Sequence, residues 1–272
     1  MKRIEQRFAQ LRANGRTGLI PFVTAGDPSP EATVAIMHAL VEAGADLIEL
    51  GVPFSDPMAD GPVIQHANER ALLKHVGLHD ILGWVREFRE RDTSTPIVLM
   101  GYLNPIEVYG YAAFASDAVA AGVDGVLLVD CPIEELETAR SLRDAGLQQI
   151  FLAAPTTSDA RLAGICAKTE GFLYYVSFSG ITGAAQLQTE AVRERVAILR
   201  KHARTPIAVG FGVRDAASAA TIAGFADAVV IGSALVERLA RSTSIDEARQ
   251  CAITFLTPIR AALDAGTAAD AA

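Results

Sequence analysis

Apolar runs and helical patterns alternate along this chain, and one phrase returns where a helix gives way to a strand. The phrase is a helical stretch, then Ala-Gly, often an Asp, and then an apolar run; it occurs at residues 42–52, 120–130, 144–154 and 222–232. A glycine at a helix C-terminus closes the helix in the left-handed conformation. A short loop can then lead into a buried parallel strand. Each phrase therefore predicts one helix-to-strand step.

Four more apolar runs have the same strand character, which brings the predicted strands to eight. They cover residues 19–26, 96–102, 171–177 and 206–212, with helical patterns between them. Eight strands that alternate with helices over about 250 residues are typical of a (β/α)8 barrel. A doubly wound open sheet is the alternative, but TAGDPSPE follows the first strand where that fold has a GxGxxG fingerprint. The TIM barrel is therefore the predicted fold.

The two ends of the chain add to this fold. Ile4, Phe8 and Leu11 have helical spacing, which predicts an extra N-terminal helix ahead of the first strand. No linker rich in Gly, Ser or charge interrupts the series, so we expect residues 1–272 to form a single TIM-barrel domain. The last stretch, DAGTAADAA at 264–272, is predicted to be a frayed tail.

Composition excludes several classes of partner. Half of the 272 residues are hydrophobic and 21% are charged, as in a globular protein with one sizeable core. The net charge of −8 argues against a nucleic-acid partner. Cys131, Cys166 and Cys251 form no CxxC pair, which favours a reducing cytoplasm over a disulfide framework or a zinc site. No run reaches the roughly 18 apolar residues of a membrane span, and no signal peptide is indicated.

Glu49 is the first candidate for chemistry. In barrels of this kind the active site lies at the C-terminal ends of the strands. Alternation along the second predicted strand places Leu47, Glu49 and Gly51 on one side, so Glu49 is expected to point into the barrel near its upper rim. A buried carboxyl group is costly without a partner or a task. The alternative is an interior ion pair, but the eight strand runs contain no Lys or Arg.

The loop after this strand, VPFSDPMADGP, carries two further acids. Such a loop can fold over the strand end as a lid and bring a second carboxylate to the site, which makes Asp60 the second candidate. Both acids have a simpler interpretation as turn residues, since Asp56 precedes Pro57 and Asp60 precedes a glycine.

Three glycine-containing loops favour a phosphate group. SFSGITGAA (177–185), GFGVRD and IGSALVE follow the sixth, seventh and eighth predicted strands. Glycines allow backbone N–H groups to approach an anion closely, and the last two loops of such barrels often bind phosphate. Tight turns are the alternative use of these glycines. The five histidines have no metal-ligand spacing and no strand carries a Schiff-base lysine, so neither a metal nor imine chemistry is expected.

These motifs together resemble the tryptophan synthase alpha chain family. The most specific is IELGVPFSDPMADGP, and FVTAGDP, MGYLNPI, LLVDCP, YYVSFSGITG, VGFGV and VIGSALV extend the resemblance over nearly the whole chain. The family has the barrel fold and cleaves indole-3-glycerol phosphate by a retro-aldol reaction to indole and glyceraldehyde 3-phosphate. The resemblance implies that Glu49 is the catalytic acid and base, and that Asp60 lies beside the indole nitrogen.

The resemblance also implies roles for the remaining candidate residues. The walls of the indole pocket would be Phe22, Met100, Leu127 and Tyr174. Thr182 and Gly183 would belong to the closing loop, and the phosphate contacts would be Phe211, Gly212, Gly232 and Ser233. The residues that match the family's contact region for its partner are Pro53, Asp56, Pro57, Asn104 and Pro132.

The implied partner is a beta chain in an αββα heterotetramer. Indole would pass to this beta chain for tryptophan synthesis. Any pyridoxal phosphate would belong to the beta chain, so no cofactor is expected in this one. Two alternatives stay open: a stand-alone indole-3-glycerol phosphate lyase, and a phosphosugar isomerase or epimerase on the same barrel.

Overall fold

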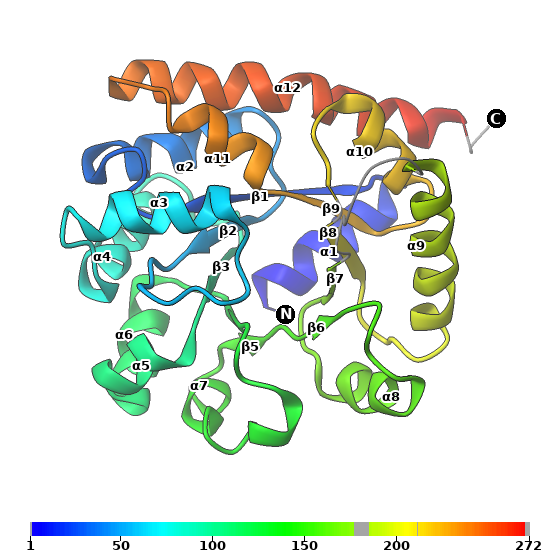
Figure 1. The fold of residues 1–272 in the computed structure, drawn as a ribbon, viewed down its shortest axis with the longest axis horizontal. Helices are drawn as coiled ribbons and strands as arrows, with labels where there is room; N and C mark the ends of the chain where they lie inside the picture. Colours follow the sequence, from blue (N-terminus) through cyan, green and yellow to red (C-terminus); the bar gives the residue numbers. More distant parts are fainter. Residues whose placement is uncertain (1, 177–184, 211, 270–272) are drawn as a thin grey trace.

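The computed structural model describes residues 2–176, 185–210 and 212–269, and its helices are arranged around the strands (Figure 1). In chain order the elements are α1 (Arg3–Ala13), β1 (Gly18–Thr24), η1 (Pro30–Ala32), α2 (Thr33–Glu42), β2 (Ile48–Gly51), α3 (Pro62–Leu72), α4 (Leu78–Arg89), β3 (Ile97–Gly101), α5 (Leu103–Tyr109), α6 (Tyr111–Ala121), β4 (Gly125–Leu128), η2 (Ile133–Glu135), α7 (Arg140–Asp144), β5 (Gln148–Gln149), β6 (Leu152–Ala153), α8 (Asp159–Lys168), β7 (Leu173–Val176), α9 (Ala185–Arg200), β8 (Ile207–Gly210), α10 (Ala216–Ala223), β9 (Ala228–Ile231), α11 (Ser233–Leu239) and α12 (Ile245–Ala269).

The strands form one parallel sheet with the order β5-β4-β3-β2-β1-β9-β8-β7-β6. Its two ends, β5 and β6, are separated in the chain by only residues 150 and 151. β5 pairs with β4, β6 pairs with β7, and the intervening Ile150 N–H donates to the carbonyl of Val126. We therefore count β5 and β6 as two parts of one strand, which closes the sheet. The predicted (β/α)8 barrel is confirmed, with its fifth strand in two short pieces.

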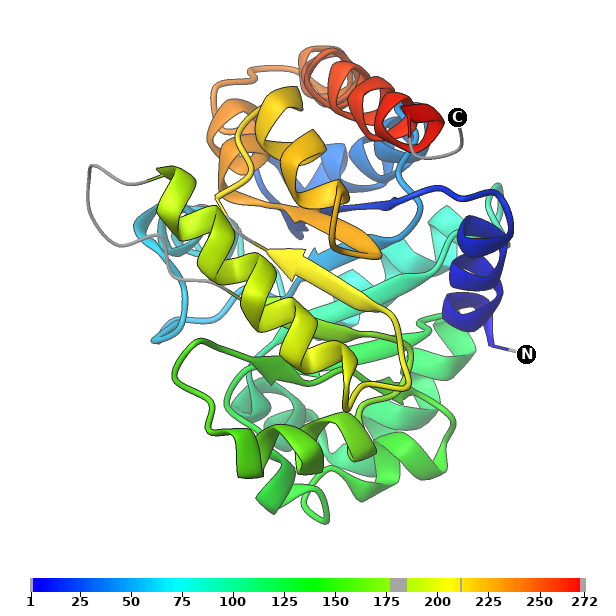
Figure 2. The ribbon, with the colours of Figure 1, turned by 90° about the vertical axis from the view of Figure 1, so that its right-hand side faces the viewer.

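Helix α1 lies at the end of the barrel where the strands begin (Figure 2). Its Ile4, Phe8 and Leu11 are buried among the side chains that fill the barrel interior, and the Phe8 and Phe172 ring centroids are 5.8 Å apart. The predicted N-terminal helix therefore exists, and its apolar face closes the lower end of the barrel. This arrangement leaves the C-terminal ends of the strands as the open face.

The strand residues alternate between two cores. In β2, Ile48 and Leu50 belong to the outer core between strands and helices, whereas the preceding Leu47 belongs to the barrel interior. The two-residue period of a strand therefore places Glu49 on the inner side, as the sequence pattern predicts.

The glycines that close the helices follow the predicted pattern in three of the four repeats. Gly44, Gly122 and Gly146 have φ values of 96°, 94° and 103°. The prediction was wrong for Gly224, which has φ −65° and stays right-handed. Here the N–H groups of the next two residues both donate to the carbonyl of Ile222, so α10 ends in a tight turn that needs no left-handed residue.

The aspartate of the repeated phrase has a structural task that the sequence did not reveal. These aspartates come just before the strands β2, β4 and β9, and they are Asp46, Asp124 and Asp227. Each carboxylate accepts a hydrogen bond from a backbone N–H group of the neighbouring strand. The donors are the N–H groups of Leu19 (2.9 Å), Ile97 (2.8 Å) and Ile207 (2.8 Å), respectively. Each aspartate also pairs with an arginine of a surrounding helix, namely Arg260, Arg89 and Arg200. At three places, therefore, one aspartate connects two neighbouring strands by a hydrogen bond and connects a helix to them by an ion pair.

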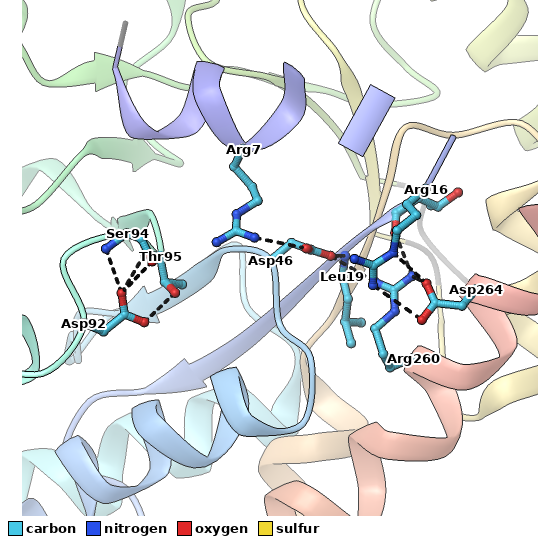
Figure 3. Close-up of polar contacts among 10 residues, drawn as sticks. Arg7, Arg16, Leu19, Asp46, Asp92, Ser94, Thr95, Arg260 and Asp264 are labelled. Carbon is cyan, nitrogen blue, oxygen red and sulfur yellow. Dashed lines mark hydrogen bonds and ion pairs between the residues drawn. The ribbon is translucent and has the colours of Figure 1, made fainter. Parts of the chain in front are cut away.

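One of these buried networks surrounds Asp46 (Figure 3). Arg260 of α12 donates from Nη1 to Asp46 Oδ2 at 2.9 Å and from Nη2 to the Thr17 carbonyl at 3.0 Å. Its side chain is 9% exposed, and that of Asp46 is 6% exposed. Burial raises the pKa of Asp46, while its hydrogen bond from Leu19 and its arginine neighbours oppose this rise.

We expect Arg260→Leu to lower the free energy of unfolding at pH 7 by about 3 kcal/mol. Removing one partner of a buried pair leaves the other charge uncompensated, which costs about 3–5 kcal/mol. Arg7, 3.8 Å from Asp46, keeps the loss at the low end. Urea unfolding would measure the change. The control Arg16→Leu removes an arginine whose ion pair with Asp264 is half-exposed, and should cost less than about 1 kcal/mol. Equal losses would contradict the buried-pair interpretation.

The C-terminal end differs from its prediction. Helix α12 continues through residue 269, so residues 264–269 are helical where a frayed tail was expected, and 270–272 lie outside the described residues. Asp264 supports this last part because it pairs with both Arg16 and Arg260. None of the described helices has the length and apolar character needed to cross a membrane.

Candidate active site

Glu49 lies in β2 and points into the barrel below its open face. It sits in β2 between Phe22 of β1 and Val98 of β3, which are its partners in the strand register. The side chain is fully buried, and neither carboxyl oxygen has a hydrogen-bond partner among the described residues. The alternative of an interior ion pair is therefore not seen in the described part of the barrel.

Burial changes the acidity of this group. It raises the pKa of Glu49 from its ordinary value of 4.5 to about 8, because a charged carboxylate loses its contact with water when it is buried. No neighbouring charge opposes this rise. A carboxyl group with such a pKa is protonated at neutral pH, so it can donate a proton and afterwards take one back. A general acid and base works best when its pKa lies near the working pH.

Asp60 is held near the site by the loop after β2 and by the first turns of α3. Its carboxylate accepts a hydrogen bond from Asn68 Nδ2 at 3.3 Å, and its backbone carbonyl accepts one from Gln65 Nε2 at 2.8 Å. The Tyr102 hydroxyl accepts from the Ala59 N–H at 3.0 Å, which ties the loop to the end of β3. Burial raises the pKa of Asp60, and hydrogen bonds with Tyr102 and Asn68 oppose the rise.

Both acids line one cavity of about 730 Å³ at this end of the barrel. A cavity of this size can hold a small organic ligand. Besides Glu49 and Asp60, the structure brings together there six of the predicted binding residues: Phe22, Met100, Tyr174, Gly212, Gly232 and Ser233. Residues from β1, β2, β3, β7, β8 and β9 thus contribute to a single site.

Two aromatic side chains form walls of the cavity because glycines make room for them. A Cβ atom on Gly51 would lie 2.5 Å from the Phe22 ring, and one on Gly210 would lie 2.4 Å from the Tyr174 hydroxyl. Both distances are too short for any other residue at these glycines. Burial raises the pKa of Tyr174 well above its ordinary value, and the acids Glu49 and Asp60 raise it further. Tyr174 therefore stays neutral, and the walls are suited to a flat apolar group.

Four predicted binding residues are not placed on this cavity. Leu127 is fully buried in the barrel interior, where Met100 is its partner in the strand register, and it is not among the lining residues. Thr182, Gly183 and Phe211 lie outside the described residues, as does most of the loop 177–185.

Sequence reasoning missed several residues of the site. Tyr102 and Asn68, which hold Asp60 and its loop, were not predicted, nor were Arg214 and Arg238, which line the cavity. Tyr102 could have been predicted from the sequence. It follows Met100 by two residues at the end of a strand, so alternation places both side chains on the same side of that strand. Arg238 had none, since only the turn of α11 brings it to the cavity.

The residues predicted to contact a partner lie in segments that follow β2, β3 and β4 on the same open face. Asp56, Asn104 and Pro132 are exposed, Pro57 is half-buried and Pro53 is buried. Two large apolar side chains in the same segments are strongly exposed, Met58 at 86% and Val108 at 80%. A partner that covers these segments would bury both apolar side chains.

The site contains no arrangement for a metal in the part of the chain that the structure describes. No three or more His, Cys, Asp or Glu side chains there could hold a metal ion together. What the arrangement offers instead is proton transfer from a neutral buried acid, beside apolar walls and glycine-rich loop ends.

Comparison with known proteins agrees with this geometry. The family model for the tryptophan synthase alpha chain matches residues 8–265. The tryptophan synthase alpha chain of Xanthomonas axonopodis pv. citri is 59% identical over 98% of this chain and 100% of the relative, and that of Ralstonia nicotianae is 59% identical over 97% and 100%. A crystal structure of tryptophan synthase subunit alpha from Legionella pneumophila superimposes with a TM-score of 0.91 at 44% identity, covering 97% of this chain and 99% of that one. The chain therefore belongs to the tryptophan synthase alpha chain family.

Proposed function

We propose that Glu49 and Asp60 carry out the family's reaction in this protein, the cleavage of indole-3-glycerol phosphate to indole and glyceraldehyde 3-phosphate. The observation that supports this most is the state of Glu49, a fully buried carboxyl group with a pKa of about 8 on the wall of the cavity. Such a group is destabilising unless it has a task, and its pKa suits proton transfer near neutral pH.

The chemistry requires two proton transfers. The bond between the indole ring and the glycerol chain breaks once ring carbon C3 has been protonated, and neutral Glu49 supplies that proton. The resulting carboxylate then accepts the proton of the glycerol hydroxyl as the carbon–carbon bond breaks and the aldehyde forms. The electron pair of the broken carbon–carbon bond returns to the ring, which leaves neutral indole. Glu49 is again protonated, with the proton of the hydroxyl group. The protonated ring carries positive charge on its nitrogen, which the carboxylate of Asp60 stabilises.

The cavity offers a place for each end of this substrate. Phe22, Met100 and Tyr174 provide apolar walls for the indole ring. Gly212, which has φ 45°, and Gly232 with Ser233 expose backbone groups for the phosphate. Contacts from Leu127, Thr182, Gly183 and Phe211 remain predictions from the family resemblance.

Indole release from indole-3-glycerol phosphate tests the function directly. The purified chain should form indole and glyceraldehyde 3-phosphate in equal amounts, and formation of neither would contradict the proposal. A phosphosugar isomerase on the same barrel would have no need of the aromatic walls formed by Phe22 and Tyr174.

Membership of the family also implies a beta chain as partner. We propose an αββα assembly in which the beta chain carries pyridoxal phosphate and receives the indole. The exposed Met58 and Val108, together with Pro53, Asp56, Pro57, Asn104 and Pro132, support the open face as the contact surface. The loop after β2 belongs both to this surface and to the site, since it carries Asp56 and Asp60. The predicted cytoplasmic location, favoured by the cysteines, stays a prediction.

We expect the isolated chain to be a weak enzyme that the beta chain activates. A partner that binds better to the catalytic arrangement of the Asp60 loop shifts the loop toward it. Coupling between two sites typically changes a binding affinity by about 5-fold to 150-fold. Steady-state indole release with and without saturating beta chain measures the effect. Asp56→Ala should reduce this activation more than it reduces the basal rate. An isolated chain already at full rate would instead identify a stand-alone lyase.

A further inference from the structure

Two arginines stand where the cavity meets the solvent. Arg214 lies in the loop between β8 and α10, and Arg238 lies in α11. Both are exposed, and both line the same cavity as Gly212, Gly232 and Ser233. Both also line a neighbouring cavity with Phe255 and Cys251 of α12, so their positive charge lies between that cavity and the glycine-rich end of the active-site cavity.

Arg238 is held in place by two contacts. Its Nη1 donates to the carbonyl of Ala234 at 2.8 Å, and Ala234 itself lines the cavity. Its guanidinium carbon lies 4.3 Å from the centre of the Phe255 ring of α12. A guanidinium group stacked on an aromatic ring can still donate hydrogen bonds in its own plane, so the N–H groups that Ala234 does not use can reach an anion. The charge of Arg238 is thus fixed beside the first turn of α11.

Arg214 is positioned through its backbone. Its N–H donates to Ser218 Oγ at 3.1 Å, and the neighbouring Asp215 caps α10 by accepting from the Ser218 N–H at 2.8 Å. The loop that carries Arg214 is therefore tied to the start of α10, and the side chain extends from a fixed point on the cavity wall.

The nearby carboxylates leave the guanidinium groups of these two arginines available to bind an anion. Within residues 2–176, 185–210 and 212–269, no salt bridge joins Arg214 or Arg238 to a carboxylate, although Asp215 is next to Arg214 in the chain. Glu237 also lines the cavity, but its carboxylate lies 3.3 Å from Arg241. The whole chain has a net charge of −8, which repels an anionic ligand at long range. Local cations at the entrance offset this repulsion.

We propose that Arg214 and Arg238 form a cationic rim that selects phosphate-bearing substrates. The rim raises the affinity for the phosphate and leaves the proton transfers at Glu49 unchanged. The proposal rests on the proposed function, because it takes the anion to be the phosphate of the substrate. Since both side chains are exposed, their contribution is screened by salt.

Titration calorimetry with glycerol 3-phosphate tests the rim. At about 0.01 M salt, where charges act over about 30 Å, Arg238→Gln and Arg214→Gln should each bind roughly threefold to tenfold more weakly than the unchanged chain. At about 1 M salt, where this range falls to about 3 Å, the differences should nearly vanish. The control Arg249→Gln makes the same change of charge on α12 at a residue that pairs with Glu42 and does not line the cavity. It should bind as the unchanged chain does.

Indole release separates this proposal from the proposed function. Both rim variants should show a raised KM for indole-3-glycerol phosphate with kcat nearly unchanged, because the rim acts on binding. Equal affinities of Arg238→Gln, Arg214→Gln and Arg249→Gln at low salt would overturn the rim while normal turnover left the function standing. If the wild-type protein neither binds glycerol 3-phosphate nor releases indole, that result would instead contradict the proposed function itself.

Discussion

Replacing Glu49 with Gln is expected to lower the rate of indole-3-glycerol phosphate cleavage by about 10² to 10⁴, the range typical of general acid–base catalysis. The loss should lie toward the upper end, because one group serves both proton transfers. Gln has nearly the shape of protonated Glu49 but cannot give or take the proton. Substrate affinity should change little, since the aromatic walls and glycine loops remain.

Single-turnover indole formation and binding of glycerol 3-phosphate would measure these two quantities separately. Asp60→Asn should be nearly as damaging, because a neutral amide stabilises the positive charge on the indole nitrogen far less than a carboxylate does. Glu90→Gln makes the same change at an exposed surface position and serves as the control. A Glu49→Gln variant that keeps more than about a tenth of the rate would show that another group transfers the protons.

The same substitution should make the protein more stable at neutral and alkaline pH. The pKa of Glu49 is about 8 in the folded chain, against an ordinary value of 4.5. Below pH 4.5 the group is protonated in both folded and unfolded chains and adds no pH dependence. Between pH 4.5 and 8 only the unfolded chain releases the proton, which favours unfolding by about 1.4 kcal/mol for each pH unit. Above pH 8 the penalty is constant.

Glu49→Gln removes this penalty because the amide does not ionise. Its gain in free energy of unfolding over the unchanged chain should be near zero at pH 4.5 and reach about 4 to 5 kcal/mol above pH 8. Urea unfolding at several pH values would follow this rise, and Glu90→Gln should show no such trend. A gain independent of pH would mean that Glu49 is not buried in its neutral form. In the proposed mechanism, this loss of stability accompanies the neutral acid that transfers the protons.

The strands could be predicted from sequence because their signals are local. Each run of apolar residues after an Ala-Gly phrase became a strand, and alternation placed Glu49 inside the barrel correctly. The break of the fifth strand between β5 and β6 could not be predicted, because it depends on how Ile150 and its neighbours pair with β4 on one side and β7 on the other. The conformation of Gly224 likewise depends on how α10 ends, which the Ala-Gly phrase does not encode.

The site was predicted where each strand contributes its own last residues, and missed where distant segments meet. Phe22, Met100 and Tyr174 belong to the strands β1, β3 and β7 and line the cavity. Leu127 occupies a similar place in the sequence, yet it lies in the barrel interior and not on the cavity. Arg238 lies near the end of α11 and not at a strand end, so its place on the cavity depends on the turn of that helix.

The aspartate–arginine pairs at the lower end of the barrel have a consequence for variation among relatives. Asp46, Asp124 and Asp227 fasten the strands at the end opposite the cavity, and none of these contacts involves a loop of the open face. The residues that hold the strands together and the residues that line the cavity are thus at opposite ends of the barrel. Arg214 and Arg238 of the proposed rim take no part in these pairs, so we expect their exchange to change substrate affinity and to leave the barrel intact.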